Sequence, residues 1–267
     1  MKKLLFIGAG KMATAIAGGL VKAKVFAPAE LQAYDVNSTA AADFTRATGI
    51  PCATENCAAL IEDSERVLLA IKPQVMVKAL TELSGKLADK TIISIIAGAT
   101  LNRLAELTGS SKVIRVMPNT PALIGKGAAG IAALPGVDDA EFALSEKIFA
   151  AVGVVIRVEE HNLNAVTALS GSGPAYVFEF IQALADGGVA SGLSRATATE
   201  LAVQTVIGAA EMVKLTKLHP SALKDQVTSP GGTTIRALEV LEDRAFAGTV
   251  IQAVCAACRR SEELGKN

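Results

Sequence analysis

The chain contains 267 residues, more than the roughly 100–200 residues of a typical domain, so its length predicts two domains. Lysine and arginine together number 26, aspartate and glutamate also number 26, and tryptophan is absent. Because this composition gives no basic field and few aromatic platforms, we expect no nucleic-acid partner. The apolar run at residues 4–7 stops at Gly8, too short for a signal peptide, and no stretch is apolar enough for a membrane span. We therefore expect a cytoplasmic protein without a membrane partner.

The first strand is expected at residues 4–7, because a continuous apolar run is typical of a buried parallel strand. It ends in Gly8-Ala9-Gly10-Lys11-Met12-Ala13, and a helix rich in small residues is expected at residues 12–24. A G-x-G-x-x-A pattern between strand and helix is typical of a dinucleotide-binding turn, where the backbone approaches a pyrophosphate at the helix N-terminus. Gly8 and Gly10 are therefore candidate cofactor residues.

A second strand is expected at residues 31–34, and it ends in Asp35. An acidic side chain at this place can bond the adenosine ribose hydroxyls, which favours NAD. Asn37 and Ser38 follow closely and can instead hydrogen-bond a ribose 2′-phosphate. The alternative is an ordinary turn formed by residues 35–38.

Further strands are expected at residues 67–71, 91–96, 113–117 and 130–133, and helical patterns separate most of them. This alternation predicts a doubly wound α/β sheet whose ligands bind at the carboxyl ends of the strands. Lys72 and Pro73 lie in one such loop, where Lys72 can touch the cofactor or be a solvated lysine. Asn119 lies in another loop, where it can orient the nicotinamide or form a turn with its flanking prolines.

A helix at about residues 138–152 and a strand at residues 154–158 complete the first domain, and residues 159–162 form the expected junction. Apolar helical runs follow at residues 165–169, 176–189, 196–214 and 236–264, without a convincing strand. We therefore expect a Rossmann-like dinucleotide-binding domain at residues 1–159 and an all-helical domain at residues 160–267. The run at residues 176–189 is apolar nearly all round and needs cover on every side, which predicts a homodimer.

A glycine-rich loop, Thr228-Ser229-Pro230-Gly231-Gly232-Thr233-Thr234, precedes the helical pattern of Ile235, Leu238, Leu241 and Ala245. Its glycines let a small molecule approach the backbone, and the helix N-terminus offers unpaired N–H groups to a small carboxylate. The alternative is a helix cap in an ordinary turn, because Ser and Thr commonly precede helices.

Few residues are suited to acid–base or metal chemistry. Cys255 and Cys258 have C-x-x-C spacing, but no second ligand pair completes a metal site, so we expect no metal. The two histidines, His161 and His219, lack triad or metal spacing. A nicotinamide fold without an obvious ionisable catalyst fits hydride transfer to an activated electrophile such as a protonated imine. The alternatives are a hydroxyacid dehydrogenase, which needs a lysine or histidine that residues 171–188 lack, and a nucleotide-sensing protein without turnover.

Along essentially its whole length the chain resembles the pyrroline-5-carboxylate reductases. The resemblance rests on five motifs: Phe6-Ile7-Gly8-Ala9-Gly10, Ala70-Ile71-Lys72-Pro73-Gln74, Arg115-Val116-Met117-Pro118-Asn119-Thr120-Pro121, Gly171-Ser172-Gly173-Pro174-Ala175-Tyr176 and Leu223-Lys224-Asp225-Gln226-Val227-Thr228-Ser229-Pro230-Gly231-Gly232-Thr233-Thr234. It implies the last step of proline biosynthesis, the reduction of 1-pyrroline-5-carboxylate to L-proline by NADPH or NADH. The substrate would be held at a helical dimer domain.

The resemblance also implies roles for individual residues. The backbone of residues 229–233 would grip the substrate carboxylate, and the hydroxyl of the catalytic Thr234 would hydrogen-bond the ring nitrogen. The implied substrate residues are Glu160, Ser229, Gly231, Gly232, Thr233 and Thr234. The residues implied to line the cofactor are Ala9, Lys11, Met12, Asp35, Asn56, Ile71, Lys72 and Ala97, with Gln226 reaching it from the partner subunit.

Two positions depart from the usual pattern of that family. The family commonly has Asn where this chain has Lys11, and often a small polar residue where it has Asp35. Lysine is compatible with a pyrophosphate, whereas the Asp35 carboxylate should repel a 2′-phosphate. We expect NADP as the cofactor with NAD as the alternative, and a homodimer with a larger ring of dimers as an alternative assembly.

Overall fold

The computed structural model describes residues 2–265. Contacts within the chain divide it into two parts, which we name the sheet unit and the helical unit. The sheet unit contains residues 2–172 and those from Ala257 onward, and the helical unit is Gly173–Ala256. Residues 160–172, which the sequence assigns to the second domain, therefore group with the sheet. The domain boundary at residue 159 stays a prediction.

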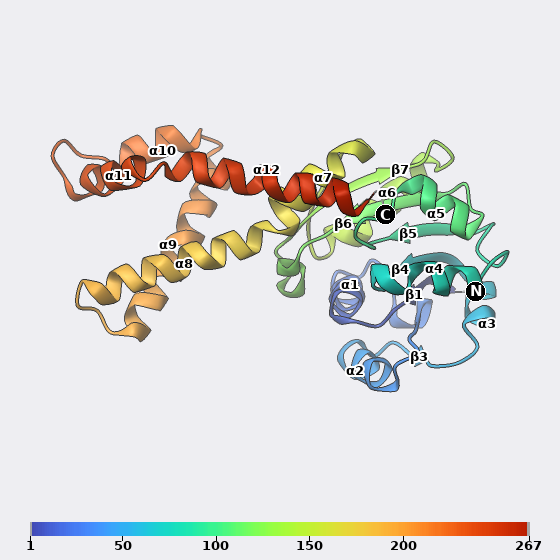
Figure 1. Cartoon of the computed structure of the whole chain (residues 1–267). Coiled ribbons are helices and arrows are strands. Elements are labelled where there is room, and N and C mark those ends of the chain that lie inside the picture. The colour runs from blue at the N-terminus through green and yellow to red at the C-terminus, as the bar shows by residue number, and fades with distance from the viewer. Residues whose placement is uncertain (1, 266–267) are drawn as a thin grey trace. The chain divides into compact units, whose positions relative to one another are not determined.

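The sheet unit is built on an eight-stranded sheet in the order β3-β2-β1-β4-β5-β6-β7-β8 (Figure 1). The strands are β1 (Lys2–Ile7), β2 (Leu31–Tyr34), β3 (Cys52–Ala53), β4 (Ser64–Leu69), β5 (Thr91–Ser94), β6 (Val113–Met117), β7 (Gly127–Ala133) and β8 (Gly153–Arg157). All neighbours are parallel except β6 and β7, which pair antiparallel. Because the strand order reverses between β1 and β4, the predicted doubly wound sheet is confirmed. The periodicity does not predict β3, which is too short to show an alternating pattern.

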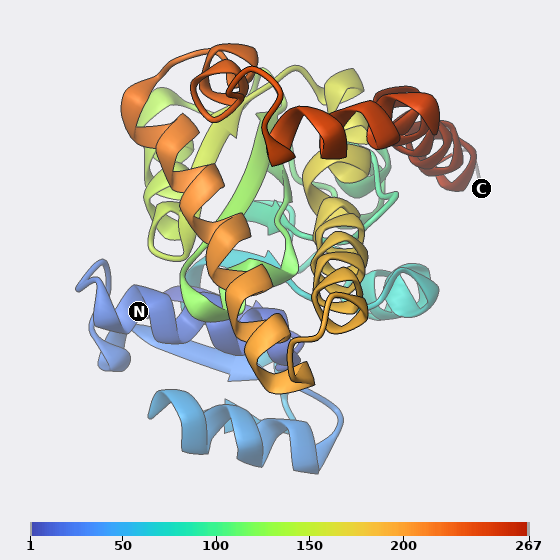
Figure 2. The same cartoon turned by 90° about the vertical axis from the view of Figure 1, so that its left-hand side faces the viewer.

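Helices cover both faces of the sheet, as Figures 1 and 2 show. Successive residues of a strand point to opposite faces, so Leu4 and Phe6 of β1 pack in one core while Leu5 and Ile7 pack in the other. The first core is closed by α1 (Lys11–Lys22), α2 (Ser38–Thr48) and α6 (Asp139–Ala150), and the second by α3 (Cys57–Glu62), α4 (Pro73–Glu82), α5 (Leu101–Thr108) and α7 (Leu163–Val166). Each large apolar side chain that is fully buried stabilises the fold by about 1.5–3 kcal/mol.

The helices of the sheet unit differ in how their N-termini are capped. The side chains of Asn37, Thr100 and Asp138 accept hydrogen bonds from the first turns of α2, α5 and α6, at 3.0, 3.2 and 2.8 Å. Such caps typically contribute about 1 kcal/mol each. In contrast, α1 follows Gly10 and α4 follows Lys72, and neither helix has a side-chain cap. The N-termini of these two helices are therefore available to another acceptor.

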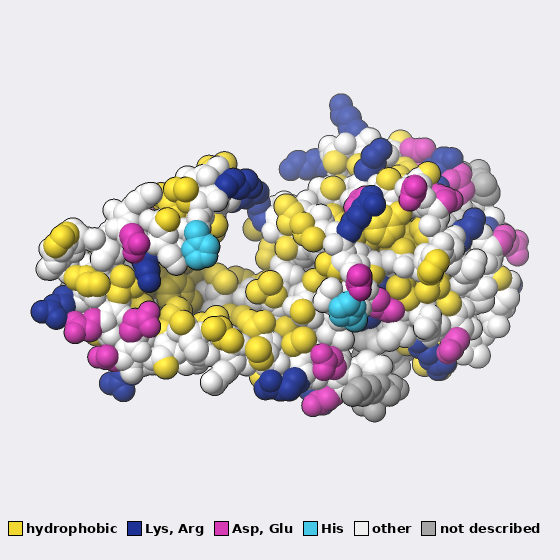
Figure 3. Space-filling model, turned by 90° about the horizontal axis from the view of Figure 1, so that it is seen from above, with side chains coloured by type: hydrophobic (Ala, Val, Ile, Leu, Met, Phe, Trp, Pro, Cys, Tyr) yellow, Lys and Arg dark blue, Asp and Glu magenta, His cyan; other side chains and the backbone are white. Residues whose placement is uncertain are grey.

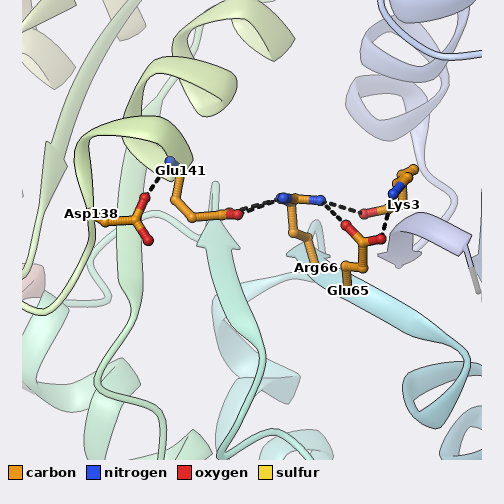
Figure 4. A network of polar contacts seen from close by, with 5 residues as sticks. All are labelled: Lys3, Glu65, Arg66, Asp138 and Glu141. Carbon is orange, nitrogen blue, oxygen red and sulfur yellow. Dashed lines mark hydrogen bonds and ion pairs between the residues drawn. The ribbon is translucent and has the colours of Figure 1, made fainter.

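A network of charged side chains joins β1, β4 and α6 (Figure 4). Arg66 donates to both carboxylate oxygens of Glu141, at 2.8 and 2.5 Å, and to Glu65 at 2.7 Å. Glu65 also accepts from Lys3 Nζ at 2.6 Å, and this hydrogen bond holds the pKa of Glu65 below its ordinary value. The bonds between Arg66 and Glu141 fasten α6 to the sheet. The network lies toward the beginning of β1 and β4, and therefore away from the carboxyl ends of the strands.

The helical unit contains α8 (Gly173–Ala190), α9 (Arg195–Thr216), α10 (Pro220–Gln226), α11 (Thr233–Asp243) and the first part of α12 (Phe246–Leu264). This confirms the predicted all-helical architecture. Its small core lies between α8 and α9 and contains Ala185, Ala198 and Ala202, which are buried. Short side chains at these places let the two helices approach closely.

The single helix predicted at residues 236–264 is wrong, because the chain forms two helices there. The break between α11 and α12 contains Ala245, whose φ of +52° is left-handed. A residue in that conformation ends a right-handed helix, and the apolar pattern that includes Leu241 does not signal it. The periodicity also fails to predict α10, which begins at Pro220, a residue favoured at the first helical position.

Large apolar side chains are exposed on the helical unit, where Figure 3 shows them gathered. Phe178 of α8 is 63% exposed, Leu201 of α9 is 54% exposed and Ile251 of α12 is 63% exposed. Within α8 only Ala185 is buried, which agrees with the prediction that this chain alone does not cover the helix. Apolar surfaces of this kind mark interaction sites. Among residues 2–265, no helix combines the length and the apolar character that crossing a membrane requires.

Candidate active site

The turn after β1 has the geometry of a dinucleotide-binding loop. Gly8 has a φ of +99°, and a Cβ atom there would lie 2.6 Å from the carbonyl oxygen of Ala70. Gly10 precedes α1 with an extended backbone, and a Cβ atom there would meet no atom within 4 Å. Gly8 is therefore required for the turn itself, whereas Gly10 leaves open space beside the uncapped N-terminus of α1. An anion such as a pyrophosphate fits this arrangement.

Asp35 lies beside this turn and uses both of its carboxylate oxygens. Oδ2 accepts from the backbone N–H of Ala9 at 2.8 Å, and Oδ1 accepts from the backbone N–H of Asn37 at 2.8 Å. The Asn37 side chain accepts from Ala40 and so serves as the cap of α2. Both residues therefore have structural roles in this turn, and their contacts with a ribose or a 2′-phosphate stay predictions.

Three more loops bring predicted cofactor residues to the same edge of the sheet, because β1 to β5 are mutually parallel. Asn56 follows β3 and is exposed, with a φ of +56°. The half-buried Ile71 and the exposed Lys72 follow β4, and Pro73 is the first residue of α4. Ala97 is exposed in the loop after β5. Ligands of doubly wound sheets bind at this edge.

Asn119 is buried after β6, and backbone groups occupy both ends of its amide. Its Nδ2 donates to the Ser170 carbonyl oxygen at 2.9 Å, and its Oδ1 accepts from the backbone N–H of Ala128 at 2.9 Å. These bonds join the turn after β6 to β7 and to η4 (Thr167–Gly171), a π-helical turn. The structural interpretation of Asn119 therefore has direct support, and a contact with the nicotinamide stays a prediction.

Glu160 begins the short turn η3 (Glu160–Asn162), and its carboxylate is held within the sheet unit. Oε1 accepts from the backbone N–H of Leu101 at 2.6 Å and from Arg115 Nη1 at 3.2 Å. The preceding Glu159 is 81% exposed and contacts the exposed His161 at 3.2 Å. The two adjacent acids therefore differ, because only Glu160, which is half-buried, pairs with a buried arginine.

The glycine-rich loop of the helical unit leads into α11 without a side-chain cap. Gly232 occupies the capping position, and its N–H donates to the Ser229 carbonyl oxygen at 3.1 Å. Gly231 has a φ of +68°, which a side chain would disfavour. Thr233 is exposed and Thr234 is half-buried, and the Thr234 hydroxyl has no hydrogen-bond partner among residues 2–265. The Ser or Thr cap of the alternative interpretation is thus absent from this described part of the chain. The first turn of α11 is therefore available to an anion. Gln226 is exposed at the end of α10.

A groove of about 1060 Å³ runs beside α1 in the sheet unit. One end is lined by Ala9, Gly10 and Lys11, which are predicted cofactor residues. The remainder lies along α1, α2 and the turn η2 (Thr120–Ile124), away from Asp35 and Lys72. We therefore assign only the Gly10 end of this groove to the candidate cofactor site. Among residues 2–265, no cluster of His, Cys, Asp and Glu could hold a metal ion.

Comparisons with known proteins find matches that together cover nearly the whole chain. Residues 160–264 match the family model described as pyrroline-5-carboxylate reductase dimerisation, and residues 3–98 match the model described as NADP oxidoreductase, coenzyme F420-dependent. The pyrroline-5-carboxylate reductase of Arabidopsis thaliana is 45% identical over 99% of this chain and 96% of its own length. That of Escherichia coli is 40% identical over 100% of this chain and 99% of its own length.

The chain belongs to the pyrroline-5-carboxylate reductase family.

Solved structures of pyrroline-5-carboxylate reductases agree with this assignment. The enzyme from Coxiella burnetii superposes with a TM-score of 0.92 at 35% identity, covering 100% of this chain and 99% of that one. The Plasmodium falciparum enzyme, determined with NADP bound, has a TM-score of 0.87 at 34% identity and covers 99% and 98% of the two chains. A prephenate dehydrogenase from Aquifex aeolicus has a TM-score of 0.53 at 15% identity, and that likeness concerns the fold alone.

The family membership confirms the resemblance that the sequence motifs indicate. Sequence reasoning places Arg115 in a family motif but gives it no role, and in the structure it is buried and pairs with Glu160. The signal was present, because a lone charge stands within the otherwise apolar strand at residues 113–117. A buried charge normally needs a partner, and the partner here follows in sequence only after β8.

Proposed function

We propose that this chain reduces the cyclic imine 1-pyrroline-5-carboxylate to L-proline with a reduced nicotinamide dinucleotide. The observation that carries the proposal is identity of 40–46% with pyrroline-5-carboxylate reductases along nearly the full chain. In this reaction hydride passes from the nicotinamide to the imine carbon, and the protonated imine nitrogen becomes the ring amine. The substrate is already electrophilic, which agrees with the lack of an obvious ionisable catalyst.

The cofactor would bind at the carboxyl edge of β1 to β5. The open space at Gly10 and the uncapped N-terminus of α1 fit a pyrophosphate, and Lys11 adds a positive charge. Asp35, anchored on the Ala9 amide, would lie near the adenosine ribose. NADP is the first choice, supported by the Plasmodium falciparum relative with NADP bound, and NAD is the alternative because the Asp35 carboxylate opposes a 2′-phosphate. The bound cofactor would supply the hydride, and these residues would hold and orient the cofactor.

The substrate would bind at the loop before α11. Unpaired N–H groups at the first turn of α11 suit the substrate carboxylate, and Gly231 and Gly232 permit its close approach. The half-buried Thr234 hydroxyl can hydrogen-bond the ring nitrogen, whose electron density rises as hydride reaches the adjacent carbon. Ser229 and Thr233 complete the set, and Gln226 is assigned to the cofactor of the partner subunit.

The assembly is proposed as a homodimer formed through the helical unit. Exposed apolar residues such as Phe178 and Ile251, together with the match of residues 160–264 to a dimerisation model, support it. Such a helix is usually buried by packing against the same surface of a second copy of the chain. A ring of dimers is proposed as a larger assembly. We also propose a cytoplasmic location, and domain limits of 1–159 and 160–267.

One assay tests this function against the two alternatives. The chain is mixed with NADPH and 1-pyrroline-5-carboxylate, and the absorbance of the reduced nicotinamide is followed. We expect consumption that depends on both the chain and the imine, with L-proline as the product. A chain that binds NADPH without consuming it would be a nucleotide sensor. A chain that consumes NADPH only when a keto acid replaces the imine in the same mixture would be a dehydrogenase of that class.

A further inference from the structure

Arg115 is the one charged residue that is buried among residues 2–265, with a side chain only 7% exposed. It lies in β6, where its register partner on β5 is Ser94, the last residue of that strand. Its ion pair is with Glu160 Oε1, at 3.2 Å. An unpaired charge at such a position is strongly unfavourable, so the charged Arg115 needs the Glu160 carboxylate as its partner.

The same carboxylate oxygen also fixes the beginning of α5. Glu160 Oε1 accepts from the backbone N–H of Leu101, the first residue of α5, at 2.6 Å. A carboxylate at a helix N-terminus is favoured by the helix dipole as well as by this hydrogen bond. Through one oxygen atom, β6 and the N-terminus of α5 are therefore held together.

The loop fixed in this way carries a predicted cofactor residue. Residues 95–100 connect β5 to α5, with Ala97 exposed and Gly98 at a φ of +78°. At its strand end the loop is held by the N–H of Ile95, which donates to the Leu69 carbonyl oxygen at 3.1 Å. At its helix end the Leu101 N–H donates to Glu160 of η3, and Glu160 in turn pairs with Arg115 of β6. Ile96, Ala99 and Leu101 of this segment are buried in the second core, so packing holds the loop as well. The bond from Leu101 to Glu160 adds a polar anchor at the helix end of the loop that carries Ala97.

The strand order shows which half of a dinucleotide this loop would meet. The pyrophosphate of a doubly wound fold lies at the point where the order reverses, between β1 and β4. Asp35 at the end of β2 lies on the adenosine side. The loop after β5 lies on the other side of β4, which is the nicotinamide side.

We propose that Glu160 is a positioning residue for the nicotinamide half of the cofactor site, acting through Leu101 and the loop at residues 95–100. This differs from the role of substrate residue that the family resemblance implies. The inference rests on the proposed function, because it takes the cofactor to be a nicotinamide dinucleotide.

The test compares Glu160→Gln with Glu159→Gln, a matched control at an adjacent and 81% exposed acid. Binding of NADPH without substrate is measured from the fluorescence of the reduced nicotinamide, and KM for the imine is measured at saturating NADPH. Glu160→Gln should weaken NADPH binding by about tenfold and leave KM for the imine within about twofold. Glu159→Gln should match the parent chain in both measurements.

A second variant guards against simple unfolding. Arg115→Met combined with Glu160→Leu removes both charges, a replacement that buried ion pairs often tolerate, and it also removes the bond to Leu101. This double variant should melt near the parent temperature and still bind NADPH weakly. Parental NADPH binding by the folded double variant would overturn the inference.

Two other outcomes of the single variant would also overturn it. A raised KM for the imine with unchanged NADPH binding would make Glu160 a substrate residue, and parental values for both would make the ion pair merely structural. Failure of the proposed function has a different signature, because a parent chain that binds NADPH but does not reduce the imine still permits the binding comparison.

Discussion

The two glycines of the turn after β1 should respond differently to the same substitution. Gly8→Ala places a methyl group 2.6 Å from the Ala70 carbonyl oxygen, at a φ of +99°. Left-handed backbone costs an alanine about 1–2 kcal/mol, and overpacking costs about 1–3 kcal/mol. The sum is about 2–5 kcal/mol, which lowers Tm by about 4–20 °C at about 2–4 °C for each kcal/mol.

Gly10→Ala should leave stability nearly unchanged. Its φ of −73° and ψ of 179° are ordinary for alanine, and the new Cβ atom meets no protein atom within 4 Å. Alanine is a poorer helix cap than glycine, by roughly 0.5–1 kcal/mol. A gain of about 0.4–1 kcal/mol from the less flexible unfolded chain offsets that cost. The methyl group would instead occupy the space proposed for the pyrophosphate, so NADPH binding should weaken by about tenfold or more.

The assay pairs thermal unfolding, followed by circular dichroism, with NADPH titration of each variant. The expected pattern is a lowered Tm and weak binding for Gly8→Ala, against a parental Tm and weak binding for Gly10→Ala. Parental NADPH affinity in Gly10→Ala would refute the reasoning, because the open space at Gly10 would then not face the cofactor.

Four further predictions concern other parts of the chain. Asp35→Ser removes a carboxylate near the ribose and should raise the ratio of kcat/KM for NADPH over NADH by about tenfold; an unchanged ratio would mean that the carboxylate only anchors the turn. Phe180→Glu puts an unpaired charge on the apolar face of α8 and should weaken the dimer by about 3–5 kcal/mol of association free energy, with loss of activity. A dimer on sedimentation would contradict this. Thr234→Ala should lower kcat/KM for the imine about tenfold to a hundredfold, whereas Thr234→Ser should keep most of the parental kcat/KM. Equal impairment of the two variants would mean that the hydroxyl has no role. The pKa of Glu65 is lowered by its bond with Lys3, so its contribution to stability is present above the unfolded value of about 4.3 and is lost as pH falls below it; Tm measured from neutral pH to pH 3 should fall less for Glu65→Gln than for the parent.

The sheet and its cofactor turn could be predicted from the sequence because their signals are local. The apolar run before Gly8 and the motif after it lie within a few residues, and the repeated strand and helix patterns fix the doubly wound topology. The antiparallel pairing of β7 with β6 could not be predicted, although the two strands follow each other in the chain, because residues 130–133 have the same apolar pattern as a parallel strand. Periodicity reports that a segment is a strand and carries no direction.

The contacts of the polar site residues could not be predicted from the sequence, for a different reason. Glu160 meets Arg115 and Leu101 across 45 and 59 positions of the chain, so no spacing rule connects them. Asn119 similarly holds Ser170 and Ala128. The break at Ala245 was missed because a single left-handed residue leaves the apolar pattern intact. Family resemblance implies roles for such residues, whereas their hydrogen-bond partners are known only from the structure.

The central claim, hydride transfer from a nicotinamide to a cyclic imine carboxylate, has one direct measurement. The chain is given 1-pyrroline-5-carboxylate and NADPH that carries deuterium at the transferable position of the nicotinamide ring, and the proline formed is analysed by mass spectrometry. We predict L-proline with one deuterium on the former imine carbon, formed by the parent chain and much more slowly by Thr234→Ala. Proline without deuterium, or no proline from a chain that binds NADPH, would contradict the account.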